Sequence, residues 1–111
     1  MCRIGFKDVL GSKMQIKIHE AYRKIVALSD KELLGKTFEE GIKQIEVKPS
    51  FFEGEAKNRD EIIQILQDMA REDATFNIIG EKSVDAALEA GIISKEGIIR
   101  IDGVPVALVL M

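Results

Sequence analysis

The stretch NRDEIIQILQDMAREDATFNIIGEKSVDAALEAG, residues 58–91, decides the predicted fold because it contains the two longest helical patterns of the chain. Asn58 precedes an apolar stripe at helical spacing, and Glu61 follows three residues later, which is typical of a helix N-terminus. A second helical pattern covers 81–90 and ends at Gly91, a residue suited to a helix end. We therefore expect two main helices, with 75–80 forming a short helical turn between them.

Strand-like segments flank this helical region on both sides. They are alternating or continuous apolar runs at 2–7, 14–19, 25–28, 42–47, 98–101 and 104–110. Asp102 and Gly103 separate the last two segments and predict a two-residue hairpin turn. Pro105 suggests that the last strand begins at an edge or a bulge, because proline cannot donate to a strand ladder.

Shorter elements are predicted from local cues. Ser29 followed by Glu32 fits a capping box and predicts one or two helical turns. We interpret 37–41 as a connection and 50–54 as an irregular loop. Residues 2–7 are expected to form a hairpin with 14–19, because the link between them contains the turn residues Gly11 and Ser12.

The order of strands, helices and strands predicts an α+β fold. A length of 111 residues suits one domain over 1–111. We expect a mainly antiparallel sheet with the two main helices packed on one face. Residues 1–13 are expected to add an N-terminal strand and a link.

Composition limits the location and the class of the protein. Cys2 is the one cysteine, so the sequence predicts neither a disulfide framework nor a cysteine-rich metal site. No apolar run is long enough to span a membrane, and the start does not resemble a signal peptide. These features predict a cytoplasmic location. The charged fraction of 32% exceeds the usual value of about 25%, a composition that suits a thermophile.

Charge is distributed unevenly along the chain. Residues 1–28 carry six basic and two acidic groups, a net charge of +4, whereas the rest carries ten basic and seventeen acidic groups, a net charge of −7. Such a basic end could contact phosphates of RNA or of a ribonucleoprotein, and a solvated surface is the alternative interpretation. The candidate polyanion contacts are Arg3, Lys7, Lys17, Arg23 and Lys24.

Motifs for catalysis or cofactor binding are not found in the sequence. It contains no glycine-rich phosphate loop and no nucleophile elbow, and we expect no metal and no cofactor. His19, the sole histidine, is expected on a polar strand face. Asn77 lies in an apolar run, so it either braces the break between the helices or faces a ligand. The candidate ligand-binding residues are Asp30, Asn77, Glu81 and Asp102.

Four segments, at 27–36, 47–54, 74–81 and 101–105, together resemble the archaeal family called domain of unknown function 424. The resemblance covers about 14–111 and implies an archaeal cytoplasmic protein with no established catalytic residues. Because genes of the family often lie near translation genes, the resemblance also implies an RNA- or ribosome-associated role. Val106 stands where the family often has histidine. The signature positions that correspond are Asp30, Gly35, Gly54, Asn77, Gly80, Gly103 and Pro105.

Three functions remain open from the sequence. The first is a non-enzymatic accessory protein that associates with RNA or with translation. The second is a small-molecule-binding protein or enzyme with a pocket near Asp30, Asn77 and the turn at 102–105. The third is a homo-oligomeric scaffold that pairs through the apolar C-terminal strand. The sequence does not decide whether the protein is an enzyme, and it favours a non-enzymatic role.

Overall fold

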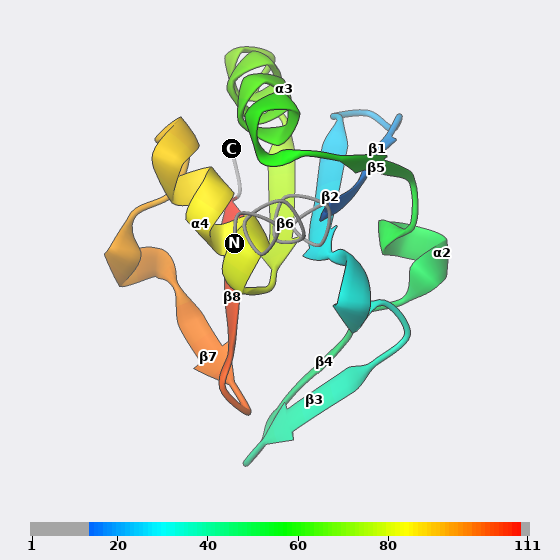
Figure 1. The fold of residues 1–111 in the computed structure, drawn as a ribbon, viewed down its shortest axis with the longest axis vertical. Coiled ribbons are helices and arrows are strands. Elements are labelled where there is room, and N and C mark those ends of the chain that lie inside the picture. Colours follow the sequence, from blue (N-terminus) through cyan, green and yellow to red (C-terminus); the bar gives the residue numbers. More distant parts are fainter. Residues whose placement is uncertain (1–13, 110–111) are drawn as a thin grey trace, which may run out of the picture.

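The computed structural model describes residues 14–109. Within this range, six strands form the main sheet in the order β5-β1-β2-β6-β8-β7, and two more form a separate hairpin, β3-β4 (Figure 1). The strands are β1 (Met14–His19), β2 (Ile25–Asp30), β3 (Thr37–Glu40), β4 (Lys43–Glu46), β5 (Glu55–Lys57), β6 (Thr75–Ile79), β7 (Ile99–Ile101) and β8 (Val104–Val109). The helices are α2 (Pro49–Phe52), α3 (Arg59–Arg71) and α4 (Glu81–Ala90), with 3₁₀ turns at Lys31–Leu33 and Lys95–Gly97.

The main sheet is antiparallel except at its centre. Strand β2 pairs with β6 in parallel, with Ala27 opposite Asn77. The pairs β1-β2, β1-β5, β6-β8 and β7-β8 are all antiparallel. The expected α+β class with a mainly antiparallel sheet is therefore confirmed.

Helices α3 and α4 cover one face of the sheet, as predicted. Their buried side chains, among them Ile62, Leu66 and Val84, pack against Leu28 and Phe76 from the central strands. The predicted start of α3 is also confirmed, since the side chain of Asn58 accepts a hydrogen bond from the Glu61 N–H at 2.9 Å. None of the helices within 14–109 is long and apolar enough to cross a membrane.

The opposite face of the sheet is partly covered by α2 and by the β3-β4 hairpin. A second, smaller core forms there and contains Ala27, Val47, Phe52, Ile79, Ile101 and Val106. The hairpin also contacts the turn after β7, where the Asp102 N–H donates to Glu40 Oε1 at 2.7 Å. Both faces of the central strands are therefore buried along much of their length.

The polar side chains of β1 attach the segment at 50–54 to the sheet. The Gln15 side chain accepts a hydrogen bond from the Gly54 N–H, and Lys17 Nζ donates to the Ser50 carbonyl at 3.3 Å. His19 Nε2 lies 2.9 Å from the Phe51 carbonyl, and its ring stacks on the Phe51 ring at a centroid distance of 4.5 Å. His19 is thus half-buried against α2 instead of lying on an open polar face.

The helical turn predicted at 75–80 is wrong. Thr75–Ile79 is β6, a central strand between β2 and β8. Phe76 and Ile78 face the helices and Ile79 faces the second core, so apolar residues occur on both sides of the strand. A strand buried on both faces lacks clear alternation, which explains the mistaken assignment.

Three shorter assignments are also corrected. The predicted connection contains β3, and the predicted irregular loop contains α2, which begins at Pro49. The capping box at Ser29 is absent, because Ser29 lies buried inside β2 and the following 3₁₀ turn has no side-chain cap. Strand β1 pairs with β2 and β5. The expected partner strand at 2–7 lies outside the described residues.

Pro105 occupies an interior strand without breaking it. Strand β8 lies between β6 and β7, and the Pro105 carbonyl accepts a hydrogen bond from the Gly80 N–H at 2.9 Å, just past the last residue of β6. The missing proline N–H therefore falls where the ladder with β6 ends. β7 pairs only with Val104 to Val106, so the side of β8 facing β7 has no strand partner at 107–109 among the described residues. Homo-oligomerisation through this strand stays a prediction.

The cap of α3 gives a test of the fold. Replacement Asn58→Ala removes the acceptor for the Glu61 N–H and should lower the free energy of unfolding by about 1 kcal/mol. Asn58→Asp keeps an acceptor at this position and should cost much less. Urea denaturation of the three proteins measures the difference. Equal losses in both variants would show that the side-chain cap does not stabilise α3.

Candidate functional site

Asp30 connects the end of β2 to the start of α4. The residue is only 3% exposed, and its carboxylate accepts three hydrogen bonds, from the Lys82 N–H at 3.1 Å, the Ser83 N–H at 2.8 Å and the Ser83 hydroxyl at 2.8 Å. Gly80, the residue before α4, has no side chain to satisfy these helical N–H groups. Asp30 therefore caps α4 from a neighbouring strand, and its negative charge suits the helix N-terminus.

Gly80 fits between β6 and α4 because it has no side chain. Its φ of +116° is a conformation that other residues rarely adopt. A Cβ atom at this position would lie 2.4 Å from Asp30 Cγ, which is closer than packed atoms approach. The junction of β2, β6, α4 and β8 is therefore built around Asp30 and Gly80.

Burial raises the pKa of Asp30 above its ordinary value of 3.8. The hydrogen bonds from Ser83 and Lys82 act in the opposite direction, because they stabilise the charged form. The loss of hydration outweighs these bonds. The carboxyl group thus binds a proton more readily in the folded protein than in the unfolded chain.

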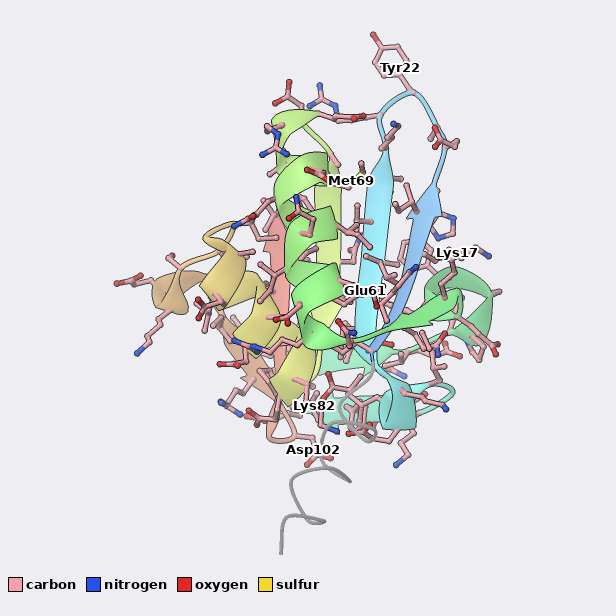
Figure 2. The ribbon with its side chains drawn as sticks, turned by 45° about the horizontal axis from the view of Figure 1, so that its top comes forward. Lys17, Tyr22, Glu61, Met69, Lys82 and Asp102 are labelled. Atoms are coloured by element: carbon pink, nitrogen blue, oxygen red, sulfur yellow. The ribbon has the colours of Figure 1, made fainter. Side chains whose placement is uncertain are left out.

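A small hollow of about 170 Å³ lies beside Asp30. It is where two of the sequence candidates, Asp30 and Glu81, meet the turn between β7 and β8. Figure 2 shows Lys82 and Asp102 at this end of the molecule. The residues that line the hollow are Asp30, Glu32, Leu33, Gly80, Glu81, Lys82, Gly103, Val104 and Pro105.

A larger groove of about 330 Å³ adjoins this hollow and shares Glu81 and Pro105 with it. We call it the α4 groove, because α4 forms one wall and the segment at 95–105 forms the other. Apolar side chains and two pairs of opposite charges line it together. Its lining residues are Glu81, Val84, Asp85, Leu88, Lys95, Ile98, Arg100 and Pro105.

Ion pairs involve most of the charges around the α4 groove. Arg100 Nη1 lies 2.9 Å from Glu81 Oε2 and also donates to the Gly103 carbonyl at 3.1 Å. Arg59 pairs with Asp85 at 2.5 Å from outside the groove. Lys95 has no ion pair with any residue in the described range. Its ammonium is thus the one groove charge without a counter-charge there.

The other two ligand candidates line neither the hollow nor the groove. Asn77 shares a row across the sheet with Lys17, Ala27 and Leu108, and Ala27 belongs to the core on the face opposite α4. Asp102 forms the predicted hairpin turn with Gly103, and both have positive φ. It is exposed and does not line the hollow. The pocket expected to include Asn77 therefore forms without it.

Of the predicted polyanion contacts, Lys17, Arg23 and Lys24 lie within the described residues, and each of them makes an interaction within the protein. Lys17 lies over α2, and Lys24 pairs with Glu72 of the neighbouring α3 end at 2.7 Å. Arg23 belongs to the turn between β1 and β2 and makes an interaction of its own. Arg3 and Lys7 lie outside the described residues.

Sequence reasoning missed the larger part of the α4 groove. Val84 and Leu88 fit the apolar stripe of a helix equally well as core residues, and Val84 is indeed buried in the main core. Lys95 and Ile98 become neighbours of α4 only because the 3₁₀ turn at Lys95–Gly97 leads the chain back along the helix. No local pattern signals this return. Within 14–109, no group of three or more histidine, cysteine or acidic residues could hold a metal ion.

The buried carboxyl of Asp30 makes a prediction about pH. Since folding raises its pKa, the folded protein holds a proton that the unfolded chain releases near pH 3.8. The contribution of Asp30 to the free energy of unfolding should therefore fall as the pH rises above 3.8, and level off above the folded-state pKa. Urea denaturation of wild type and Asp30→Asn at a series of pH values checks this.

The stability advantage of wild type over Asp30→Asn should shrink as the pH rises through this window. Asp102→Asn, which changes an exposed aspartate, is the control for the pH dependence of the rest of the chain. An advantage that grows with pH would contradict the raised pKa.

Comparison with known proteins agrees with this architecture. The fold matches a crystal structure of an uncharacterized conserved protein from Methanopyrus kandleri, with a TM-score of 0.78 and 19% sequence identity over 89% of this chain and 94% of that chain. No curated protein matches the sequence. The family described as "Protein of unknown function (DUF424)" matches residues 18–111. The chain therefore belongs to this family, as its sequence motifs suggested.

Proposed function

We propose that this protein binds a small molecule in the α4 groove. The observation that carries the proposal is the meeting of three separate chain segments, at 30–33, 80–88 and 95–105, around two adjoining hollows. Grooves built from distant segments on a rigid helix and sheet keep their shape in the absence of a ligand. The groove has the size and the mixed lining of such a site.

The lining of the groove suits an amphipathic ligand. Val84, Leu88 and Ile98 supply apolar surface, and charged side chains surround it. A volume of about 330 Å³ is near the lower end of the range of roughly 300–1,000 Å³ for ligand pockets. The fit is therefore to a compact molecule with one apolar side.

The lining also favours binding over catalysis. It includes neither serine, cysteine nor histidine, and its carboxylates Glu81 and Asp85 are each held by an arginine. A general base needs a free acceptor that can reach its substrate. Each ion pair engages one oxygen of its carboxylate and orients it toward an arginine, so the proposal is for a non-enzymatic binding protein.

A substitution that fills the groove tests the proposal. Leu88→Trp places a large ring among Val84 and Ile98 and should weaken binding of groove ligands by at least tenfold, because the ring takes the volume that the ligand needs. Backbone-amide NMR spectra, recorded with a library of small amphipathic compounds, locate and measure binding. Bound compounds should shift amides at 81–88 and 98–105.

Ile42→Trp is the matched control. Ile42 is fully exposed on the β3-β4 hairpin, outside the groove, so this variant should bind like wild type. Ile98→Trp provides a second filling variant if Leu88→Trp fails to fold. Binding that leaves groove amides unshifted, or that survives both filling variants, would contradict the proposal.

A second candidate function is association with RNA, which the expected cytoplasmic location would allow. The observation in its favour is Tyr22, a fully exposed aromatic residue followed directly by Arg23 and Lys24. Figure 2 shows its ring projecting from the β1-β2 turn, away from the rest of the described residues. An exposed ring beside cations can stack on an unpaired base.

The charges around this turn make RNA binding a weaker candidate than ligand binding in the α4 groove. Glu72 neutralises Lys24, and Glu20 and Asp73 lie in or next to the same end of the sheet. A surface with balanced charges attracts phosphates less strongly than a basic one. The α4 groove, in contrast, needs no further positive surface to act as a site.

Tyr22→Ala tests the second candidate. Loss of one stacked base should weaken binding to single-stranded RNA by about five- to a hundredfold, whereas Tyr22→Phe keeps the ring and should bind almost normally. Filter binding at low and high salt measures both effects. Absence of RNA retention by the wild-type protein at low salt would rule out this candidate.

A further inference from the structure

We infer that the ligand of the α4 groove is a small molecule with a single carboxylate on a compact apolar body. This inference rests on the proposed function and names the class of ligand. It follows from the ion pairs of the acidic lining residues, from the absence of an ion pair at Lys95 among the described residues, and from the position of the apolar side chains.

Arginine residues hold both acidic side chains that line the groove. Glu81 is held by Arg100, and Asp85 is held by Arg59, so both carboxylates that line the groove have a cation within 3 Å. Arg100 also donates to the Gly103 carbonyl, which fixes its guanidinium against the turn between β7 and β8. A ligand amine would have to displace an arginine to reach either carboxylate. Cationic ligands are therefore disfavoured.

The unpaired charge is the ammonium of Lys95. This residue opens the 3₁₀ turn Lys95–Gly97 and lines the wall opposite α4. Lys95 is the one charged lining residue without an ion pair among the described residues, so its ammonium can be neutralised by one anionic group of a ligand. A carboxylate within hydrogen-bond distance of the ammonium would form a charge-assisted bond.

The apolar side chains of the groove indicate the chemical character of the rest of the ligand. Val84 and Leu88 are one helical turn apart on α4, and Ile98 lies across from them. All three line the same groove, so a ligand body that contacts them is favoured when it is apolar, because polar groups placed against them would lose hydration without gaining a partner. A phenyl ring or a short alkyl chain fits within about 330 Å³.

Two matched probes test the inference. 3-Phenylpropionate and 3-phenylpropionamide have the same body and differ in charge. Titrated into the full chain and followed by groove-amide NMR shifts at low salt, the carboxylate should bind about three- to tenfold more tightly, as expected for one partly exposed charge-assisted bond. The advantage should shrink at high salt.

Lys95→Gln should abolish the preference for the carboxylate and leave binding of the amide unchanged. Lys43→Gln is the control, because Lys43 also lacks an ion pair among the described residues but lies on β4, outside the groove. It should keep the wild-type preference.

Equal binding of the two probes, or a preference that persists in Lys95→Gln, overturns the inference while the proposed function stands. Failure of both probes to bind also overturns it, and the compound library used with Leu88→Trp then decides separately whether the groove binds other small molecules.

Discussion

The cap that Asp30 provides to α4 is the constraint on which the rest of this end of the structure depends. One buried carboxylate joins the end of β2 to two N–H groups and a hydroxyl at the start of α4. Gly80 makes this approach sterically possible, and its own N–H binds the Pro105 carbonyl of β8. The direction in which α4 leaves the sheet is thereby fixed. The α4 groove depends on that direction, because one of its walls is α4 itself.

The same cap also limits where an anionic group could bind in the groove. A helix N-terminus normally attracts anions, but the first N–H groups of α4 are already bound to Asp30. The protein thus satisfies this site internally, at the cost of burying a carboxylate whose pKa rises as a result. The unpaired positive charge lies instead at Lys95, across the groove. In the proposed site, the cap and the ligand-binding charge are therefore different residues, Asp30 and Lys95.

Local sequence patterns predicted several helix caps and turns correctly, because these features depend on residues that are neighbours in the sequence. The cap at Asn58, the hairpin turn at Asp102 and Gly103, and the glycine at the end of α4 were all found where the patterns indicated. Strand β6 was missed because its pairing with β2 joins residues about 50 positions apart, and because burial on both faces removes alternation. Of the candidate site, Asp30 and Glu81 were predicted, but Lys95 and Leu88 were not. Their proximity arises from the path of the chain after α4.

The motif that identifies the family need not describe a ligand site. Four of its positions, Asp30, Gly80, Gly103 and Pro105, gather at the capped end of α4, where hydrogen bonds, steric limits and turn geometry explain each of them. Leu88 and Lys95 lie outside the motif. Val106, at the position where the sequence resemblance implies a histidine, is buried in the second core on the face opposite the groove. A histidine there would not reach a ligand in the groove. The family motif thus accounts for the capped junction, whereas Leu88 and Lys95 of the proposed site are not part of it.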